Sequence, residues 1–419
     1  MTGSPRTPPS AAEFATLMAP LGPFPRGARF AAGVSGGPHS LALALLARDF
    51  AASRGGEVVG LVVDHGLRAE SAAEAGWTAA ALRGQGIAAR ILALGLARGS
   101  AIQERARAGR LAALLEAAEQ EGCPWLLLGQ HAGDQAETLL FRALRGSGEA
   151  GLAGMAAARP APQAMILRPL LGMAPLRLEA LLAARGIAPL RDPSNQDRRF
   201  ARVRLRQALA DPGGEGAGTA ALGQAARAFA TRRARTEQRI AERIGAAVTL
   251  HPEGWASLEA AALGRDALAA RALAALLRLI SGAEHAPPLA AAAALLERGQ
   301  GTLHGVLWRE GRLCREPAAC APPIPATPGA LWDGRWVLPW ALPESPPGGE
   351  GLLLGAAGAV ERRLRQGLPA DVAAGLPALW RGTQRLAIPA LGGAQGAGEG
   401  PWEGVRLVFC PAGGPLCPA

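Results

Sequence analysis

The turn Ser35-Gly36-Gly37-Pro38-His39-Ser40 has the residue types that can bind a phosphate. It follows an apolar, strand-like run over residues 28–34 and precedes a helical stretch over residues 40–52. Glycines between a strand and a helix let backbone N–H groups approach phosphate oxygens, and the helix N-terminus adds partial positive charge. The pattern therefore predicts an anion-binding loop. A tight turn without a ligand is the alternative that spacing alone leaves open.

A second group of side chains could bind ammonium groups. Asp134 and Glu137 lie three residues apart in a predicted helix over about residues 134–144, so both carboxylates project from one face. Acidic residues in a first helical turn also complement the helix dipole, which is the structural alternative. His131 precedes this turn and could orient a nucleotide, although a lone histidine more often has a structural role.

The composition favours a polyanionic partner and excludes several mechanisms. The formal net charge is +10, and excess positive charge favours nucleic acid through counterion release. A GC-rich genome would also enrich arginine, and that explanation stays open. The chain has no lysine, which excludes a Walker lysine, a Schiff base and a lysine nucleophile. Phosphate charge must then be met by arginine, backbone N–H groups or a metal.

The spacing of the cysteines and the length of the apolar runs indicate the cellular compartment of the protein. The five cysteines are odd in number and never spaced as Cys-x-x-Cys, which favours a reducing cytoplasm and neither a zinc ribbon nor a disulfide scaffold. No apolar run reaches the roughly twenty residues that a spanning helix needs, and the first residues lack a secretory pattern. We therefore expect a soluble, cytoplasmic protein with no membrane partner.

Alternating strands and helices must position these residues. Strands are predicted over residues 28–34, 57–63, 87–94 and 125–128, and two of the following helices open with the capping boxes Ser71-Ala72-Ala73-Glu74 and Ser100-Ala101-Ile102-Gln103. Four such units predict an α/β fold with a doubly wound parallel sheet. Asp64 and Arg68 follow the second strand and should face the crevice at the carboxyl edge of the sheet. A helix-start carboxylate and a solvated arginine are the alternative.

The chain divides by composition into four predicted regions. They are an N-terminal extension (1–27), the α/β domain (28–210), a mostly helical, arginine-rich region (211–315) and a small, irregular or β-containing C-terminal region rich in Pro, Gly and Trp (316–419). The predicted helix over about residues 219–244 carries six arginines, among them Arg232, Arg233 and Arg235. Such a helix either binds the phosphates of a nucleic acid or only presents a charged face to solvent.

Further motifs follow the glycine turn in order. They are Val63-Asp64-His65-Gly66-Leu67-Arg68, Gly129-Gln130-His131-Ala132-Gly133-Asp134-Gln135-Ala136-Glu137-Thr138, Arg145-Gly146-Ser147-Gly148, Arg168-Pro169-Leu170 and Asp192-Pro193-Ser194-Asn195, followed by Arg202, Arg204 and Arg206. With them the chain resembles the PP-loop family of ATP pyrophosphatases, whose signature is Ser-Gly-Gly-x-Asp-Ser, and within it the tRNA(Ile)-lysidine synthetases. The similarity covers about residues 28–210 and implies an adenine-nucleotide α-hydrolase-like fold.

The resemblance implies a ligase that uses ATP, and Mg²⁺ as the cofactor ion. ATP activates the C2 oxygen of the wobble cytidine in the tRNA(Ile) with the anticodon CAU, and free lysine then attacks C2. The products are lysidine, AMP and pyrophosphate, and decoding changes from Met to Ile. The same resemblance assigns ATP to the glycine loop with Arg68 and His131, and lysine to Asp134 and Glu137. It assigns the catalytic roles to Asp64, Arg110, Arg145 and Arg202, and contacts with the tRNA to Arg232, Arg233 and Arg235.

The chain departs from the family at three positions. His39 replaces the Asp of the glycine motif, Gln130 stands where His is usual, and Gly133 stands where Asp is usual. These changes leave open a catalytically degraded paralogue that still binds tRNA. A tRNA thiolase on the same fold is the other alternative, but such enzymes generally need paired cysteines and Cys123 is alone in this domain. The sequence does not identify metal ligands, and it leaves the oligomeric state open, including a homodimer.

Overall fold

The structure is a computed structural model of the chain, and it describes residues 7–64, 66, 70–94, 102–191, 201–339, 342, 351–394 and 405–411. The chain forms two compact units, residues 1–234 and residues 235–418. The division falls inside the long helix α9 (Ala217–Ala247). The first unit thus contains the predicted α/β domain together with residues from the two regions that flank it.

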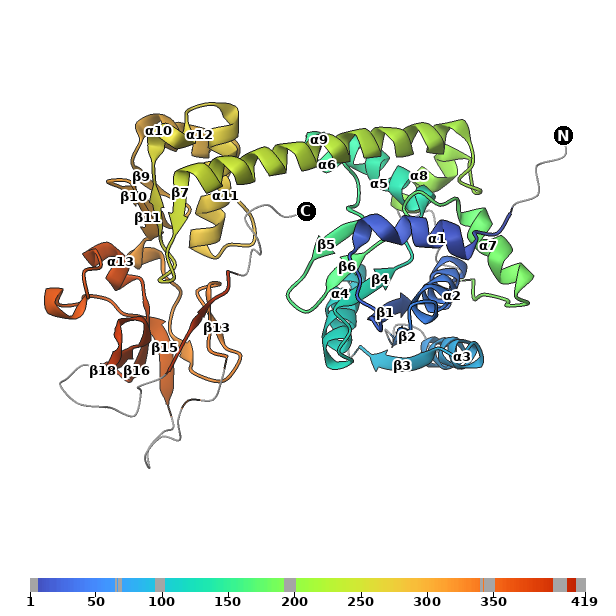
Figure 1. Cartoon of the computed structure of the whole chain (residues 1–419), viewed down its shortest axis with the longest axis horizontal. Coiled ribbons are helices and arrows are strands. Elements are labelled where there is room, and N and C mark those ends of the chain that lie inside the picture. Colours follow the sequence, from blue (N-terminus) through green and yellow to red (C-terminus); the bar gives the residue numbers. More distant parts are fainter. Residues whose placement is uncertain are drawn as a thin grey trace. The chain divides into compact units, whose positions relative to one another are not determined.

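A six-stranded sheet forms the centre of the first unit (Figure 1). Its strands are β1 (Arg29–Val34), β2 (Glu57–Asp64), β3 (Ala88–Ala93), β4 (Trp125–Leu128), β5 (Ala158–Pro160) and β6 (Met165–Leu167), in the order β3-β2-β1-β4-β6-β5. All neighbouring pairs are parallel except β5 and β6. The predicted doubly wound parallel sheet is confirmed, with one antiparallel edge strand. The strand order reverses between β1 and β4, with β2 and β3 on one side of this pair and β5 and β6 on the other, so a ligand crevice is expected at their carboxyl ends.

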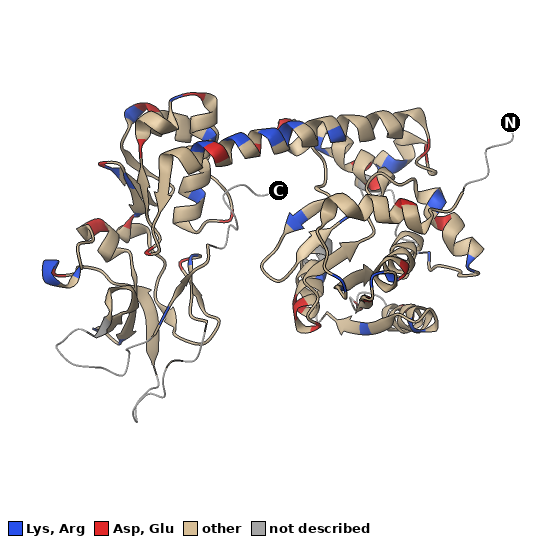
Figure 2. Cartoon of the chain, in the orientation of Figure 1, with Lys and Arg blue, Asp and Glu red and all other residues tan. Residues whose placement is uncertain are grey.

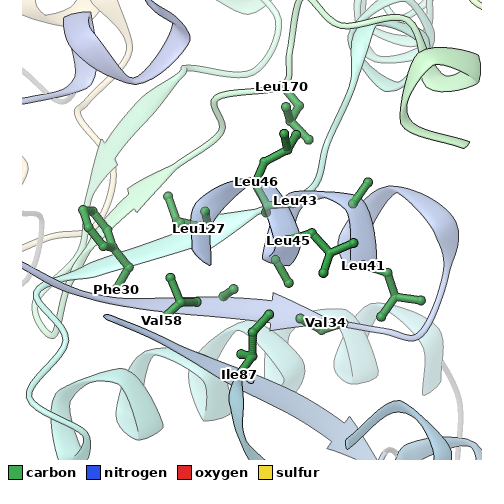
Figure 3. Packing of buried hydrophobic residues seen from close by; sticks show 14 of the residues in the cluster. Phe30, Val34, Leu41, Leu43, Leu45, Leu46, Val58, Ile87, Leu127 and Leu170 are labelled. Carbon is green, nitrogen blue, oxygen red and sulfur yellow. The ribbon is translucent and has the colours of Figure 1, made fainter. Parts of the chain in front are cut away.

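Helices cover both faces of this sheet. They are α1 (Ala11–Met18), α2 (Pro38–Ala52), α3 (Ser71–Gly84), α4 (Ile102–Gln120), α5 (Ala132–Leu144), α6 (Glu149–Leu152), α7 (Pro175–Ala184) and α8 (Ala201–Leu209). Along β1, Phe30 and Val34 pack into the cluster that contains the leucines of α2, as Figure 3 shows, whereas Ala31 packs into the cluster that contains α4. Successive residues of a strand face opposite sides, so this apolar strand is buried on both.

Residues of the predicted N-terminal extension pack against the α/β core. Ser10 begins α1, and its hydroxyl accepts a hydrogen bond from the Glu13 backbone N–H at 3.1 Å. Phe14 is 1% exposed and lies in the same cluster as α2. Arg177 on α7 donates to both carboxylate oxygens of Glu13, at 2.6 and 2.7 Å. These contacts attach α1 to the body of the first unit.

The capping box predicted at Ser71 is wrong. Glu70 precedes the helix and makes no side-chain capping bond, and Ser71 is the first residue of α3. The Ser71 hydroxyl instead donates to the carboxylate of Asp64 at the end of β2. A partner from a neighbouring strand therefore replaces the local bond that the sequence suggested. The capping box predicted at Ser100 lies outside the described residues.

Helices pack against a first small sheet in the second unit. The helices are α10 (Ala260–Leu263), α11 (Ala267–Ser281) and α12 (Leu289–Arg298), and the strands are β7 (Val248–Leu250), β8 (Ala256–Leu258), β9 (Gly301–Leu303), β10 (Val306–Arg309) and β11 (Arg312–Arg315). The sheet order is β7-β8-β11-β10-β9, and Leu273, Leu277 and Trp308 lie in its core. The arginine-rich region is thus helical with an added antiparallel sheet.

The C-terminal residues are rich in strands, which agrees with the β-containing and not the irregular alternative for this region. The elements are β12 (Ile324–Pro325), β13 (Leu331–Trp332), β14 (Trp336–Val337), β15 (Leu352–Ala356), α13 (Ala370–Ala374), β16 (Pro377–Arg381), β17 (Gln384–Ile388), β18 (Gly393–Ala394) and β19 (Val408–Phe409). They form the sheets β12-β15-β16-β17-β18 and β13-β14-β19. In the described part of the chain, no helix combines the length and apolarity needed to cross a membrane.

Candidate active site at the carboxyl edge of the sheet

The glycine loop joins β1 to α2 in a shape that only glycine can adopt at one position. Gly36 has φ +79°, and a Cβ atom there would lie 2.4 Å from Thr78 Oγ1. Gly37 precedes α2, and Pro38 is its first residue, where no N–H is needed. Within the described residues, no hydrogen bond uses the N–H groups of Gly36 and Gly37. Together with the positive end of α2, these two amides can bind an anion.

Two serines fix the shape of this loop. The Ser40 hydroxyl donates to the Gly37 carbonyl at 3.0 Å and accepts from the Ser35 backbone N–H at 3.1 Å. The two serine hydroxyls lie 3.2 Å apart, and Ser35 is exposed. Ser40 therefore acts as an internal clamp, and Ser35 presents its hydroxyl at the mouth of the loop.

The loop after β4 contacts the glycine loop directly. A Cβ atom on Gly129 would lie 3.1 Å from the His39 carbonyl oxygen, so glycine is needed for this close approach. Leu190 closes the other side, because its N–H donates to the Gly36 carbonyl at 2.9 Å. The carboxyl ends of β1 and β4 thus meet at the crevice that the strand order predicts.

Two neutral histidines line this junction. The rings of His39 and His131 are 4.0 Å apart between centroids and nearly perpendicular. Burial, and then the nearby His131, lowers the pKa of His39 to about 3, and Nε2 of His39 has no partner among the described residues. Burial also lowers the pKa of His131. At neutral pH His39 therefore adds no charge to the glycine loop, whereas an ionised aspartate at this position would add a negative charge.

The three departures from the family motif gather around His131. His39 contacts its ring, and a Cβ atom on Gly133 would come within 3.1 Å of that ring, so glycine at 133 leaves it room. The Gly133 N–H donates to Nδ1 of His131 at 3.1 Å. Gln130 is the sequence neighbour, and its Oε1 is buried without a partner among the described residues. His39 and Gly133 therefore both lie against the His131 ring.

Asp134 and Glu137 differ in their surroundings on α5. Oδ2 of Asp134 accepts a hydrogen bond from the His131 backbone N–H at 3.1 Å, and Asp134 thereby caps α5. Asp134 therefore has the structural role of a carboxylate in the first turn of a helix. Glu137 is 2% exposed and accepts a hydrogen bond from Nε of Arg206 on α8. This bond raises the pKa of Arg206. One terminal amine of Arg206 lies 3.9 Å from the other carboxylate oxygen of Asp134.

Arg206 is a site residue that sequence reasoning did not select. In the sequence it belongs to one motif with Arg202 and Arg204, and the motif predicts no separate role for it. Its signal in the sequence is the spacing of four from Arg202, because residues four apart in a helix share a face. Only the packing of α8 on α5 brings that face to the acidic residues.

The other predicted site residues occupy separate positions. Asp64 ends β2 beside the glycine loop, and its carboxylate accepts from the Gly66 N–H at 3.0 Å and from Ser71. Arg110 is exposed on α4, and Arg145 is exposed after α5 with its guanidinium 4.4 Å from the centre of the Phe141 ring. Arg68 and the side chain of Arg202 lie outside the described residues.

Comparison with known proteins shows the family. The PP-loop domain family matches residues 7–212. A tRNA(Ile)-lysidine synthase of Novosphingobium aromaticivorans is 51% identical over 180 residues, covering 42% of this chain and 54% of that protein. One from Ruegeria pomeroyi is 36% identical over 389 residues, covering 88% of this chain and 90% of that protein. This chain belongs to the tRNA(Ile)-lysidine synthase family. A further member, from Methylobacterium sp. strain 4-46, is 37% identical over 75% of this chain and 88% of its own length.

Membership of the lysidine synthase family does not favour the thiolase alternative, and Cys123 agrees. This thiol precedes β4 and so lies at the end of the strand opposite the glycine loop. It is 1% exposed, and burial raises its pKa. A buried, protonated thiol at the amino end of β4 is unsuited to carry sulfur to a nucleotide bound at the carboxyl end.

Three arginines form an exposed row on α9, whose basic stretch Figure 2 shows in blue. Arg232, Arg235 and Arg239 are exposed at spacings of three and four, so they share one face of the helix. Arg233 is half-buried and has further contacts. We call Arg232, Arg235 and Arg239 the arginine row.

A fourth arginine of α9 is structural. Arg243 donates to the Leu263 carbonyl at 2.6 Å and to Asp266 at 3.3 Å. Ile240 and Ile244 are buried in the core of the second unit. The helix therefore has a packed face and an arginine row, and the side chains of the arginine row are exposed to solvent.

Proposed function

We propose that this chain joins lysine to C2 of the wobble cytidine in tRNA(Ile) with the anticodon CAU, and converts ATP to AMP and pyrophosphate. One observation carries this proposal. A loop with two unused amides at the start of α2 lies at the junction of β1 and β4, next to the helix α5 that carries the acidic pair Asp134 and Glu137. Membership of the family supports the use of ATP and of tRNA(Ile).

The glycine loop would bind the pyrophosphate part of ATP. Its amides and the end of α2 supply fixed partial charges that need no rearrangement during the reaction. Arg68, Arg110, Arg145 and Arg202 are proposed to supply the full charges that hold the leaving group and the anticodon backbone. Since the chain has no lysine, arginine is the side chain that can supply these full positive charges.

Mg²⁺, when bound, would neutralise part of the phosphate charge. In the described residues no group of three or more His, Cys, Asp and Glu could hold a metal, but Mg²⁺ needs only one or two carboxylates besides substrate phosphates. Asp64 is the carboxylate at the strand end beside the loop. The neutral imidazole of His39 is a poorer ligand for a hard cation than the family's aspartate. We therefore propose that Asp64 and the phosphates hold the ion.

Lysine would bind at Asp134. Both carboxylates were predicted to bind its ammonium groups, but Glu137 is buried and bonded to Arg206. The side chain of Asp134 is 23% exposed, and among the described residues its Oδ1 makes no hydrogen bond and lies 3.9 Å from a terminal amine of Arg206. We propose that Asp134 accepts an ammonium group of lysine and that Glu137 acts on the substrate through Arg206.

One assay tests the proposal against both alternatives. Purified protein is incubated with the CAU-anticodon tRNA, ATP, Mg²⁺ and labelled lysine, and label in RNA is scored together with AMP and ADP. We expect label in RNA and one AMP for each lysine joined. Binding of the tRNA without lysine-dependent AMP formation would favour a degraded paralogue. A protein that fails with lysine but transfers sulfur from a donor would be a thiolase.

The lysine site is tested by Asp134→Asn. Loss of the carboxylate should raise the KM for lysine about tenfold or more while ATP binding is nearly unchanged, because only an ammonium contact is lost. Isothermal titration with ATP is the control for an intact nucleotide site. An unchanged KM for lysine would reject Asp134 as a ligand and leave it as a helix cap.

The arginine row is tested through the salt dependence of tRNA binding. Each phosphate contact contributes roughly 0.7 to 0.9 to the slope of log K against log salt concentration, so replacing three arginines by Gln should reduce its magnitude by about 2. The control replaces three exposed arginines of the first unit, Arg26, Arg83 and Arg159, which removes the same charge. Equal slopes in the two triple variants would show that the row is only a solvated face.

The remaining partners and the location stay proposals of the same kind. We propose a cytoplasmic enzyme, because tRNA, ATP and free lysine meet there. A homodimer remains a prediction, and analytical ultracentrifugation at several protein concentrations would test it.

A further inference from the structure

We propose that Arg206 recognises the α-carboxylate of the lysine substrate, so that Asp134 and Arg206 together bind the zwitterionic head of an α-amino acid. This inference rests on the proposed function, since it takes lysine as the substrate. It adds a cationic, specificity-determining residue to a site that the sequence predicts from acidic residues alone.

The geometry of Arg206 prepares it to bind a second carboxylate. Its Nε donates to Glu137, whose side chain is only 3% exposed, whereas the side chain of Arg206 is 42% exposed. When Nε of a guanidinium is bonded, the edge formed by its two terminal amines still faces another direction and can pair with a carboxylate. The buried Glu137 therefore fixes the cation and leaves its outer edge for a ligand.

Asp134 lies at the distance that an amino-acid head requires. Its Oδ1 is 3.9 Å from a terminal amine of Arg206, too far for a hydrogen bond but near enough that one ligand can reach both. Its Oδ2 is already used by the His131 backbone N–H. An α-amino acid carries an ammonium and a carboxylate on one carbon. The ammonium would meet Oδ1 of Asp134, and the carboxylate would meet Arg206.

An unpartnered hydroxyl is a second sign of a polar ligand near this pair. Thr138 is 3% exposed, and its Oγ1 has no hydrogen-bond partner among the described residues. It lies one turn beyond Asp134 on the same side of α5. Buried hydroxyls are normally satisfied, so an unsatisfied one next to a charged pair suggests that a ligand or an ordered water completes it.

The charge of the pocket then selects for an amino acid. Two carboxylates without Arg206 would attract any diamine, including diamines that lack a carboxylate. With Arg206 bound to Glu137, the three side chains carry a net charge of about −1, which suits the single net positive charge of lysine. Binding of the head also leaves the side-chain amine of lysine as the group that reacts.

The experiment measures KM for lysine, for lysinamide and for cadaverine, which has no carboxylate. The full-length protein is compared with Arg206→Gln, Arg206→Lys and Asp134→Asn, with ATP and tRNA saturating. Arg185→Gln is the matched control, since Arg185 pairs with Asp49 at 3.0 Å on another part of the first unit. KM is independent of the fraction of active protein, so partial misfolding does not obscure the result. Arg206→Gln combined with Glu137→Gln also removes the carboxylate that the single variant would leave buried and unpaired.

The wild-type protein should favour lysine over cadaverine by about tenfold to hundredfold, the effect of losing a hydrogen bond to a charged group. Arg206→Gln should raise the KM for lysine by that factor, and it should leave the values for cadaverine and lysinamide unchanged or lower them, because the acidic residues then lack their cation. Arg206→Lys should retain part of the preference, and Arg185→Gln should retain all of it. Asp134→Asn should weaken all three substrates.

Two results would overturn the inference while the proposed function stands. An equal rise in KM for all three compounds in Arg206→Gln would show that Arg206 only supports the fold of the site. A fall in KM for lysine would show that Arg206 competes with the substrate for the acidic residues. If Asp134→Asn changes no KM value, the lysine site itself is misplaced, which is a failure of the proposed function.

Discussion

His39 should make the first unit sensitive to acid. Burial beside His131 lowers its pKa to about 3, whereas a histidine in the unfolded chain has a pKa near 6.5. Between these values the unfolded chain binds a proton that the folded chain does not. The contribution of His39 to stability is therefore complete above pH 6.5 and is lost as the pH falls towards 3.

The size of this effect follows from the shift. Each pH unit below 6.5 costs about 1.36 kcal/mol for one proton, so the loss at pH 5 is roughly 2 kcal/mol. The variant His39→Asn cannot titrate and should not show this loss. The stability difference between wild type and variant should therefore shift by roughly 2 kcal/mol in favour of the variant between pH 7 and pH 5.

Hydrogen exchange of the β1 and β4 amides is the suitable assay, because it reports the stability of the first unit alone. Global unfolding of a chain with two units need not be two-state. His304→Asn is the control, since His304 is exposed in the second unit. If the difference between wild type and His39→Asn is the same at pH 7 and pH 5, burial does not keep His39 neutral, and our account of the loop fails at that residue.

Two further predictions concern the glycine loop. His39→Asp supplies a hard oxygen ligand and should lower the Mg²⁺ concentration needed for half-maximal lysine-dependent AMP formation. Ser35→Ala should reduce activity both with His39 and with Asp at position 39. A higher Mg²⁺ requirement in His39→Asp would mean that the imidazole has a positive role. Gly36→Ala should destabilise the first unit by about 1–3 kcal/mol, because a Cβ would lie 2.4 Å from Thr78 Oγ1 at a φ of +79°. Gly37→Ala, at φ −71° with its nearest contact at 3.5 Å, is the control for thermal unfolding, and equal melting temperatures would contradict this account.

The sequence by itself determined the sheet and the position of the loop. Strand-like runs ending at Val34, Asp64 and Leu128, separated by helical stretches, were enough to predict a parallel sheet, because hydrophobic periodicity is a local property. The glycine loop followed from the same local pattern, since glycines between a strand and a helix have a backbone requirement that does not depend on distant residues. The ordered motifs then identified the family, which the relatives confirm.

Only the tertiary structure decided which side chains share the site and what state they are in. Arg206 is 69 residues from Glu137, and no periodicity predicts that α8 packs on α5. The neutral state of His39 depends on burial against His131, which comes from a different strand end. Ser71 matched a local capping pattern, yet Asp64 from β2 is its partner. In each case the deciding contact joins segments far apart in the chain or on different elements, and its energy arises only after the sheet has brought them together.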